Sequence, residues 1–142
     1  FLGALANETS RYAKEFQKLV AESSYVTYLG EHSYEESIEV MRSSRVLLNG
    51  SFAEVLSLVE LEAAALGKWI VSSGVGHSRE YLPATQFRTF SENNLKEGLV
   101  IASQLADLQP IQSELNKIPN WSEVARKYDS MYEEIFLDGL KK

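Results

Sequence analysis

Short apolar runs alternate with amphipathic segments along this chain, and that alternation limits the possible folds more than any other feature. We predict strands at the five short apolar runs: residues 1–2, 25–29, 45–48, 69–72 and 87–90. We predict helices at residues 9–22, 34–41, 55–66, 91–108 and 121–137. The sequence therefore indicates an α/β fold of Rossmann-like type, with a parallel sheet between two layers of helices and helices that close the C-terminal end.

Four of the predicted strands lead quickly into a glycine: Gly3, Gly30, Gly50 and Gly74. In open parallel sheets, ligands bind beyond the carboxyl ends of the strands. We therefore expect a ligand-binding edge where these glycines lie.

Capping residues mark the ends of two predicted helices. Ser33 and Glu36 have the spacing of a capping box, in which each side chain accepts a hydrogen bond from the backbone of the other residue. Gly67 follows the helix predicted at residues 55–66, as expected for a helix end.

The 142 residues, 44% of them apolar and 24% charged, are enough for one globular folding unit. We assign residues 1–118 to a Rossmann-like domain and residues 119–142 to an amphipathic helix that packs on it. The chain begins at Phe1 rather than Met, so we expect a first strand to lie upstream.

Composition excludes several functional classes. The absence of Cys excludes disulfides and thiolate metal sites, and His32 and His77 alone are too few ligands for a buried zinc centre. A formal net charge of -6 argues against nucleic acid as a partner, because phosphates require clustered cations. No apolar run of about 20 residues and no signal peptide is present, which favours a cytoplasmic protein.

Two acids lie eight positions apart around a helix that is otherwise almost uncharged. Glu54 and Glu62 are expected near one flank of this helix, separated by about 12 Å of helical rise. That spacing suits a long anionic ligand laid along a helix N-terminus. Glu60 and Glu62 point roughly 200° apart, so one of them is expected to face inward. We interpret Glu60 as the surface carboxylate, without a role in a site.

Four motifs in this order resemble one protein family. The segments are VTYLGEHSYEESIEVMRSSRVLLNGS, SFAEVLSLVELEAAALGKWIVSS, SSGVGHSREYL and WSEVARKYDSMYEEIF. The second is similar to the family's acidic signature, two glutamates separated by seven residues and followed by Ala and Gly-Lys. Nearly the whole chain thus resembles the C-terminal, nucleotide-sugar-binding domain of a retaining glycosyltransferase of the GT-B fold, in the glycosyl transferases group 1 family.

The resemblance implies roles for particular residues. Glu54 matches the first glutamate of the signature and would be the catalytic residue, beside the donor sugar at the reacting end. Glu62 matches the second, which binds the ribose hydroxyls in the family. The other donor-binding residues that the resemblance implies are backbone groups on the diphosphate at Val55, Leu56, Ser57 and Leu58, and a turn that reads the base at Gly30 and His32.

The sequence departs from the family pattern in two places within the chain. Val55, Leu56 and Ser57 stand where the family often has Gly-Phe-Gly. His77 stands where Gly is usual, and we prefer a solvated loop histidine to an imidazole that reaches the sugar.

The resemblance implies transfer of a hexose from UDP-sugar or GDP-sugar with retained configuration. No cofactor and no metal would be required, because helix amides and cations would stabilise the departing diphosphate. The partners would be the nucleotide-sugar donor and an acceptor sugar or lipid, held by an N-terminal domain outside this chain. Peripheral association with the inner face of a membrane stays open. The alternatives are a GT-B-fold nucleotide-sugar epimerase or phosphorylase, or a non-catalytic nucleotide-binding module.

Overall fold

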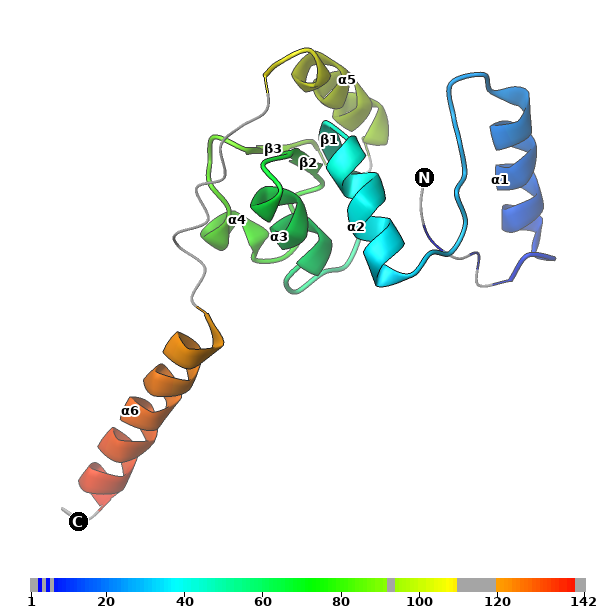
Figure 1. The fold of residues 1–142 in the computed structure, drawn as a ribbon. Coiled ribbons are helices and arrows are strands. Elements are labelled where there is room, and N and C mark those ends of the chain that lie inside the picture. The colour runs from blue at the N-terminus through cyan, green and yellow to red at the C-terminus, as the bar shows by residue number, and fades with distance from the viewer. Residues whose placement is uncertain (1–2, 4, 6, 92–93, 110–119, 140–142) are drawn as a thin grey trace. The chain divides into compact units, whose positions relative to one another are not determined.

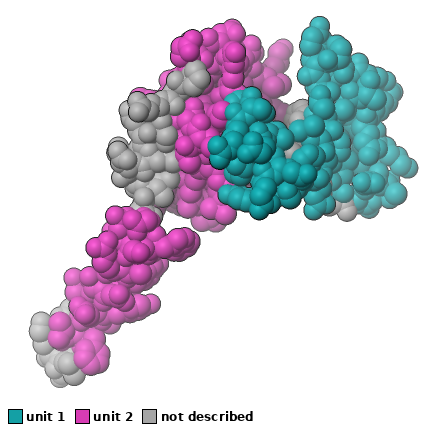
Figure 2. Space-filling model, in the orientation of Figure 1, with its two compact units in different colours: residues 1–44 teal, residues 45–142 magenta. Residues whose placement is uncertain are grey.

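The computed structural model describes residues 3, 5, 7–91, 94–109 and 120–139 (Figure 1). The chain divides into two compact units, Phe1–Ser44 and Arg45–Lys142, and each is described by itself (Figure 2). The domain boundary expected after residue 118, and the packing of the last helix, stay predictions, because residues 110–119 lie outside the described residues.

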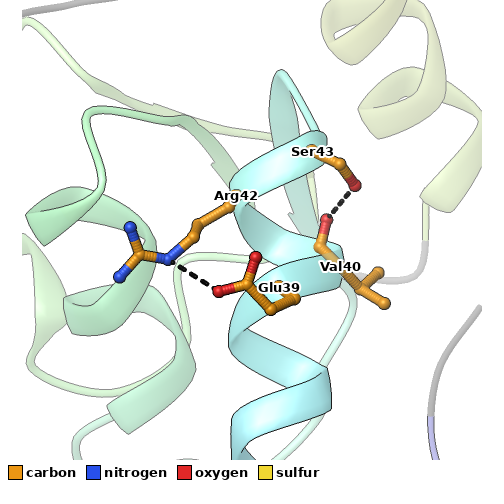
Figure 3. Close-up of polar contacts among 4 residues, drawn as sticks. All are labelled: Glu39, Val40, Arg42 and Ser43. Atoms are coloured by element: carbon orange, nitrogen blue, oxygen red, sulfur yellow. Dashed lines mark hydrogen bonds and ion pairs between the residues drawn. The ribbon is translucent and has the colours of Figure 1, made fainter.

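The first unit contains the helices α1 (Arg11–Glu22) and α2 (Tyr34–Ser43). The capping box predicted at the start of α2 is confirmed: Glu36 N–H donates to Ser33 Oγ at 3.2 Å, and Ser33 N–H donates to Glu36 Oε2 at 2.9 Å. At the other end of α2, Arg42 pairs with Glu39 at 3.3 Å, and Ser43 Oγ donates to the carbonyl of Val40 (Figure 3). Both ends of this helix are therefore fixed by its own side chains.

The prediction of a strand at residues 25–29 is wrong, because this segment joins no sheet in the described part of the first unit. Within the segment, Tyr28 Oη donates to the carbonyl of Gly3 at 2.7 Å, and just beyond it the carbonyl of Gly30 accepts from the N–H of Gly3 at 2.8 Å. A strand needs a ladder of backbone hydrogen bonds to a neighbour. The strand predicted at residues 1–2 lies outside the described residues.

The second unit contains a parallel sheet in the order β1-β2-β3. Its strands are β1 (Val46–Asn49), β2 (Trp69–Ser72) and β3 (Phe87–Thr89), which confirms three predicted strands and the parallel arrangement. Asn49 at the end of β1 is paired with Ser72 at the end of β2. Since side chains alternate along a strand, these two paired residues share one face of the sheet.

Two helices cover opposite faces of this sheet (Figure 1). On one face, α5 (Leu95–Ala106) places Leu105 in a buried cluster with Val71 and Phe90. On the other face, α3 (Leu58–Ala65) packs against β1 and β2 with two fully buried alanines, Ala63 and Ala64. This arrangement confirms the predicted three-layer α/β fold.

Two further helices complete the second unit, the single-turn α4 (Ser78–Tyr81) and the long α6 (Trp121–Gly139). Helix α4 is not among the helices predicted from the sequence. The helix predicted at residues 91–108 is shorter in the structure, because the Asn94 side chain accepts a hydrogen bond from Glu97 N–H and so fixes the start of α5.

Candidate functional site

Two loops leave the carboxyl ends of β1 and β2, and hydrogen bonds join them to each other. Ser73 Oγ donates to the carbonyl of Ser51 at 2.6 Å, and His77 N–H donates to the carbonyl of Val55 at 2.8 Å. Gly76 adopts φ +86°, and a Cβ there would lie 2.9 Å from the carbonyl oxygens of both Glu54 and Val55. The two loops therefore meet at a point where only glycine fits.

The helix after the first loop begins three residues later than predicted. Its N-cap is Ser57, in an extended conformation, and its first residue is Leu58 rather than Val55. Val55 and Leu56 lie in the loop, where Val55 N–H donates to Glu54 Oε1 at 3.2 Å. A helix that began at Val55 would have Glu54 as its N-cap, and glutamate is not a preferred cap, whereas serine is, which favours the later start.

The first amides of α3 lack hydrogen-bond acceptors. The side chain of Ser57 makes no capping bond, and no described residue accepts a hydrogen bond from the N–H of Leu58, Val59 or Glu60. Leu58 is also exposed, with 68% of its surface accessible. Unpaired N–H groups and the positive end of the helix dipole together favour an anion at this position.

Glu60 is buried, so its interpretation as a surface carboxylate is wrong. It is 1% exposed, and its Oε1 accepts hydrogen bonds from Ser72 Oγ at 2.6 Å and from Asn49 Nδ2 at 2.8 Å. Its Oε2 is buried, and no described residue donates to it. The expectation that one of the two acids faces inward is correct, but the inward one is Glu60.

The sequence contained a signal for this arrangement. Ser57 and Glu60 have the Ser-x-x-Glu spacing of a capping box, which predicts an N-cap at Ser57. The predicted start of the helix at Val55 disregards that signal, and Asn49 and Ser72 are not among the predicted site residues. Alternation along the strands would have placed these two polar ends on one face once the register was known.

Glu54 and Glu62 do not share one flank of a helix, so the expected separation of about 12 Å of helical rise is wrong. The reason is that α3 begins at Leu58, which leaves Glu54 in the loop before the helix and Glu62 within it. Glu54 is half-buried in the loop, and its carboxylate accepts from the adjacent amide of Val55. Glu62 is half-buried on α3, one helical turn beyond Leu58, and no described residue donates a hydrogen bond to its carboxylate. Its side chain is thus available for hydroxyl donors.

Two of the predicted donor-binding residues lie in the other unit of the chain. Gly30 and His32 belong to the first unit, so their share in a donor site stays a prediction. Gly30 adopts φ +77°, and His32 Nδ1 lies 2.9 Å from the carbonyl of Glu31. In the second unit, His77 is exposed and its Nδ1 lies 2.7 Å from Glu80 Oε1. These contacts agree with the interpretation of His77 as a solvated loop histidine.

In the described parts of the chain, no three His, Cys, Asp or Glu side chains are grouped so that they could hold a metal ion. None of the helices described there has an apolar stretch of the length that a membrane span requires.

Known proteins are similar to this chain in sequence and in fold. Residues 4–107 match the family model described as Glycosyl transferases group 1. The chain is 28% identical over 117 residues to the phosphatidylinositol N-acetylglucosaminyltransferase gpi3 subunit of Schizosaccharomyces pombe. The aligned segment covers 78% of this chain and 26% of that protein. It resembles the sucrose-phosphate synthase of Thermosynechococcus elongatus with a TM-score of 0.70 and 20% identity, over 96% of this chain and 38% of that one. The chain thus spans well under half the length of both proteins.

Proposed function

Since the chain belongs to the glycosyl transferases group 1 family, we propose that it binds a nucleoside diphosphate sugar, with UDP or GDP as the nucleotide. The protein that contains it would transfer the hexose to an acceptor with retained configuration. The acceptor would be held by residues outside this chain.

One observation carries the proposal most directly: the start of α3 offers consecutive unpaired amides at the carboxyl edge of the sheet. The N–H groups of Leu58, Val59 and Glu60 have no acceptor among the described residues. A diphosphate is a strong acceptor with negative charge, so it suits both the amides and the helix dipole. These amides lie slightly beyond the positions implied by the resemblance, because the helix begins at Leu58.

The two glutamates of the signature would contact opposite ends of the donor. Glu62 lies about 6 Å along the helix from Leu58, a distance that suits a ribose attached to the diphosphate. A carboxylate accepts hydrogen bonds from hydroxyl groups, and that of Glu62 has no other donor among the described residues. Glu54 lies before the helix, on the loop held by Gly76, and would contact the sugar.

During transfer, the bond between the anomeric carbon and the diphosphate oxygen would break, and the oxygen of the acceptor hydroxyl would form a new bond to that carbon. The acceptor hydroxyl would give its proton to the leaving diphosphate. The leaving diphosphate gains negative charge as this bond breaks. The amides at the start of α3 would stabilise that charge, because they are fixed before the reaction begins.

A lipid acceptor is favoured over a free sugar. The fission yeast relative is named for transfer to phosphatidylinositol, and a lipid acceptor would place the reaction at a membrane surface. The protein would then associate with the inner face of a membrane from the cytoplasm.

Substitution of Glu62 tests the proposed donor site. We expect Glu62→Ala to weaken the binding of the cognate nucleoside diphosphate by about tenfold to a hundredfold, because hydrogen bonds from hydroxyls to a charged group are worth about 1.5–3 kcal/mol. Isothermal titration calorimetry of the wild type and the variant with UDP and GDP measures this loss of affinity. The matched control is Glu133→Ala, which removes an exposed acid from α6. Equal binding by the wild type and Glu62→Ala would contradict the proposal.

A further inference from the structure

The chain contains the Ser-x-x-Glu pattern at the start of two helices, and the two copies behave differently. In α2, Ser33 and Glu36 form both bonds of the capping box. In α3, Ser57 and Glu60 form neither, although Ser57 is the N-cap and Glu60 is the third residue of the helix. Something other than the local sequence must therefore keep the second box open.

Partners from outside α3 occupy the groups that would close the box. Ser72 Oγ and Asn49 Nδ2 both donate to Glu60 Oε1, which draws the carboxylate toward the sheet. Asn49 Nδ2 also lies 3.3 Å from Ser57 Oγ, and Ser78 Oγ lies 3.4 Å from the N–H of Ser57. Asn49 and Ser72 are thus the strand-end donors that compete with the helix for Glu60.

Asn49 and Ser72 are themselves fixed by backbone donors. Ser51 N–H donates to Asn49 Oδ1 at 3.2 Å, and Gly74 N–H donates to Ser72 Oγ at 3.3 Å. With its oxygen engaged in this way, the Asn49 amide directs its N–H groups toward α3. The Ser72 hydroxyl likewise accepts from Gly74 and is left to donate to Glu60.

We propose that Asn49 and Ser72 are positioning residues that hold the Glu60 carboxylate away from the start of its own helix and so keep that start open to a phosphate group. The proposal rests on the proposed function, because it concerns the same diphosphate-binding amides. A closed box would engage the N–H of Ser57 and Glu60 and would place a negative charge at the helix entrance. Both effects oppose an anion.

The burial of Glu60 shows why two donors are needed. A carboxylate that is 1% exposed requires hydrogen bonds, and those of Asn49 and Ser72 are the ones that the described residues supply. Its second oxygen, Oε2, has no donor among the described residues. Without Asn49 and Ser72, the carboxylate can turn to the N–H of Ser57, whose contact with Ser78 Oγ is long at 3.4 Å, and so complete a capping box.

The test uses the double variant Asn49→Ala/Ser72→Ala and a triple variant that adds Glu60→Leu. In the double variant, Glu60 is expected to cap its own helix, and the affinity for inorganic pyrophosphate and for the cognate nucleoside diphosphate is expected to fall about tenfold. The triple variant removes the carboxylate but keeps a side chain of similar size. Affinity is expected to return toward the wild-type value, a rescue that general damage to the sheet would not produce.

Amide resonances give a second readout that does not depend on any ligand. Closure of the box is expected to move the resonances of Ser57 and Glu60 in the double variant toward those of Ser33 and Glu36, which have the same residue types in a closed box. Thr89→Val is the matched control, because it removes a hydroxyl from the end of β3, where no bond to Glu60 exists.

The outcomes separate this inference from the proposed function. Unmoved resonances of Ser57 and Glu60 in the double variant, or an affinity that stays low in the triple variant, would overturn the inference. A wild-type chain that binds neither pyrophosphate nor any nucleoside diphosphate would overturn the proposed function, while the resonances would still decide whether Asn49 and Ser72 hold the box open. If Ser72→Ala/Asn49→Ala fails to fold, Ser72→Ala alone is expected to give the same resonance changes at smaller amplitude.

Discussion

The backbone N–H of His77 donates a hydrogen bond to the carbonyl oxygen of Val55 at 2.8 Å. This bond joins the loop after β2 to the loop after β1, which carries Glu54. A hydrogen bond between main-chain atoms does not depend on which side chains flank it, so the His77 imidazole remains free to pair with Glu80 in solvent. The geometry around Glu54 therefore depends on the backbone of the neighbouring loop.

Gly76 makes that contact possible, and we expect Gly76→Ala to destabilise the second unit. The new Cβ would lie 2.9 Å from the carbonyl oxygens of Glu54 and Val55, at φ +86°. The left-handed conformation alone is expected to lower the free energy of unfolding by about 1–3 kcal/mol. Urea unfolding followed by circular dichroism measures the change, and an unchanged midpoint would show that the two loops are not in contact.

Gly98, at the end of the first turn of α5, is expected to reverse the usual effect of a glycine-to-alanine change. In an exposed helix interior, alanine stabilises by about 1 kcal/mol relative to glycine. At Gly98 the added Cβ would lie 2.8 Å from Phe90 Cδ1 and 3.1 Å from Leu48 Cδ1. We expect a net loss of about 1–2 kcal/mol in the free energy of unfolding, because overpacking outweighs helix propensity.

The control for Gly98→Ala is the double variant Gly98→Ala/Phe90→Leu, in which a smaller side chain replaces the ring beside the new methyl group. Its free energy of unfolding should exceed the value expected from adding the two single changes. Strict additivity would mean that Gly98 and Phe90 do not limit each other.

The charge of Glu36 should contribute to stability only away from acidic pH. Hydrogen bonds from the backbone N–H and hydroxyl of Ser33, together with His32 nearby, lower the pKa of the Glu36 carboxyl. A lowered folded-state pKa means that the contribution is present above the unfolded-state pKa of about 4.3 and is lost as pH falls through the folded-state value. Glu36→Gln should therefore be less stable than the wild type at pH 7, and the difference should vanish in acid.

Urea unfolding of the wild type and Glu36→Gln at a series of pH values tests this prediction. Glutamine can still accept in the capping box, so the comparison isolates the charge. A stability difference that stays constant from pH 7 into acid would contradict the prediction.

The strands of the sheet could be predicted from the sequence, whereas the side-chain contacts at the carboxyl edge of the sheet could not. The apolar runs that became β1, β2 and β3 are recognisable because they are short, β-branched or aromatic, and separated by helical patterns. The run at residues 25–29 has the same appearance, but strand formation requires a partner, and composition does not specify one. The start of α3 was placed too early because the apolar residues Val55 and Leu56 continue the helical pattern into the loop.

Glu60 shows most clearly what local sequence does not determine. The angle between Glu60 and Glu62 correctly predicts that one acid faces inward. Which one does so depends on the face of α3 that meets the sheet, and on the register that places Asn49 beside Ser72. Both are tertiary features, so neither the helical angle nor the family signature at Glu62 indicates that Glu60 is the buried acid.

The most direct test of a donor site at the start of α3 is an amide-shift titration of the chain with UDP, GDP and ADP in parallel. We expect saturable shifts at Leu58, Val59, Glu60 and Glu62 with one of these nucleotides, and loss of that response in Glu62→Ala. Saturable shifts centred elsewhere in the chain, or no response at the start of α3 to any of the three, would contradict a donor site at this helix.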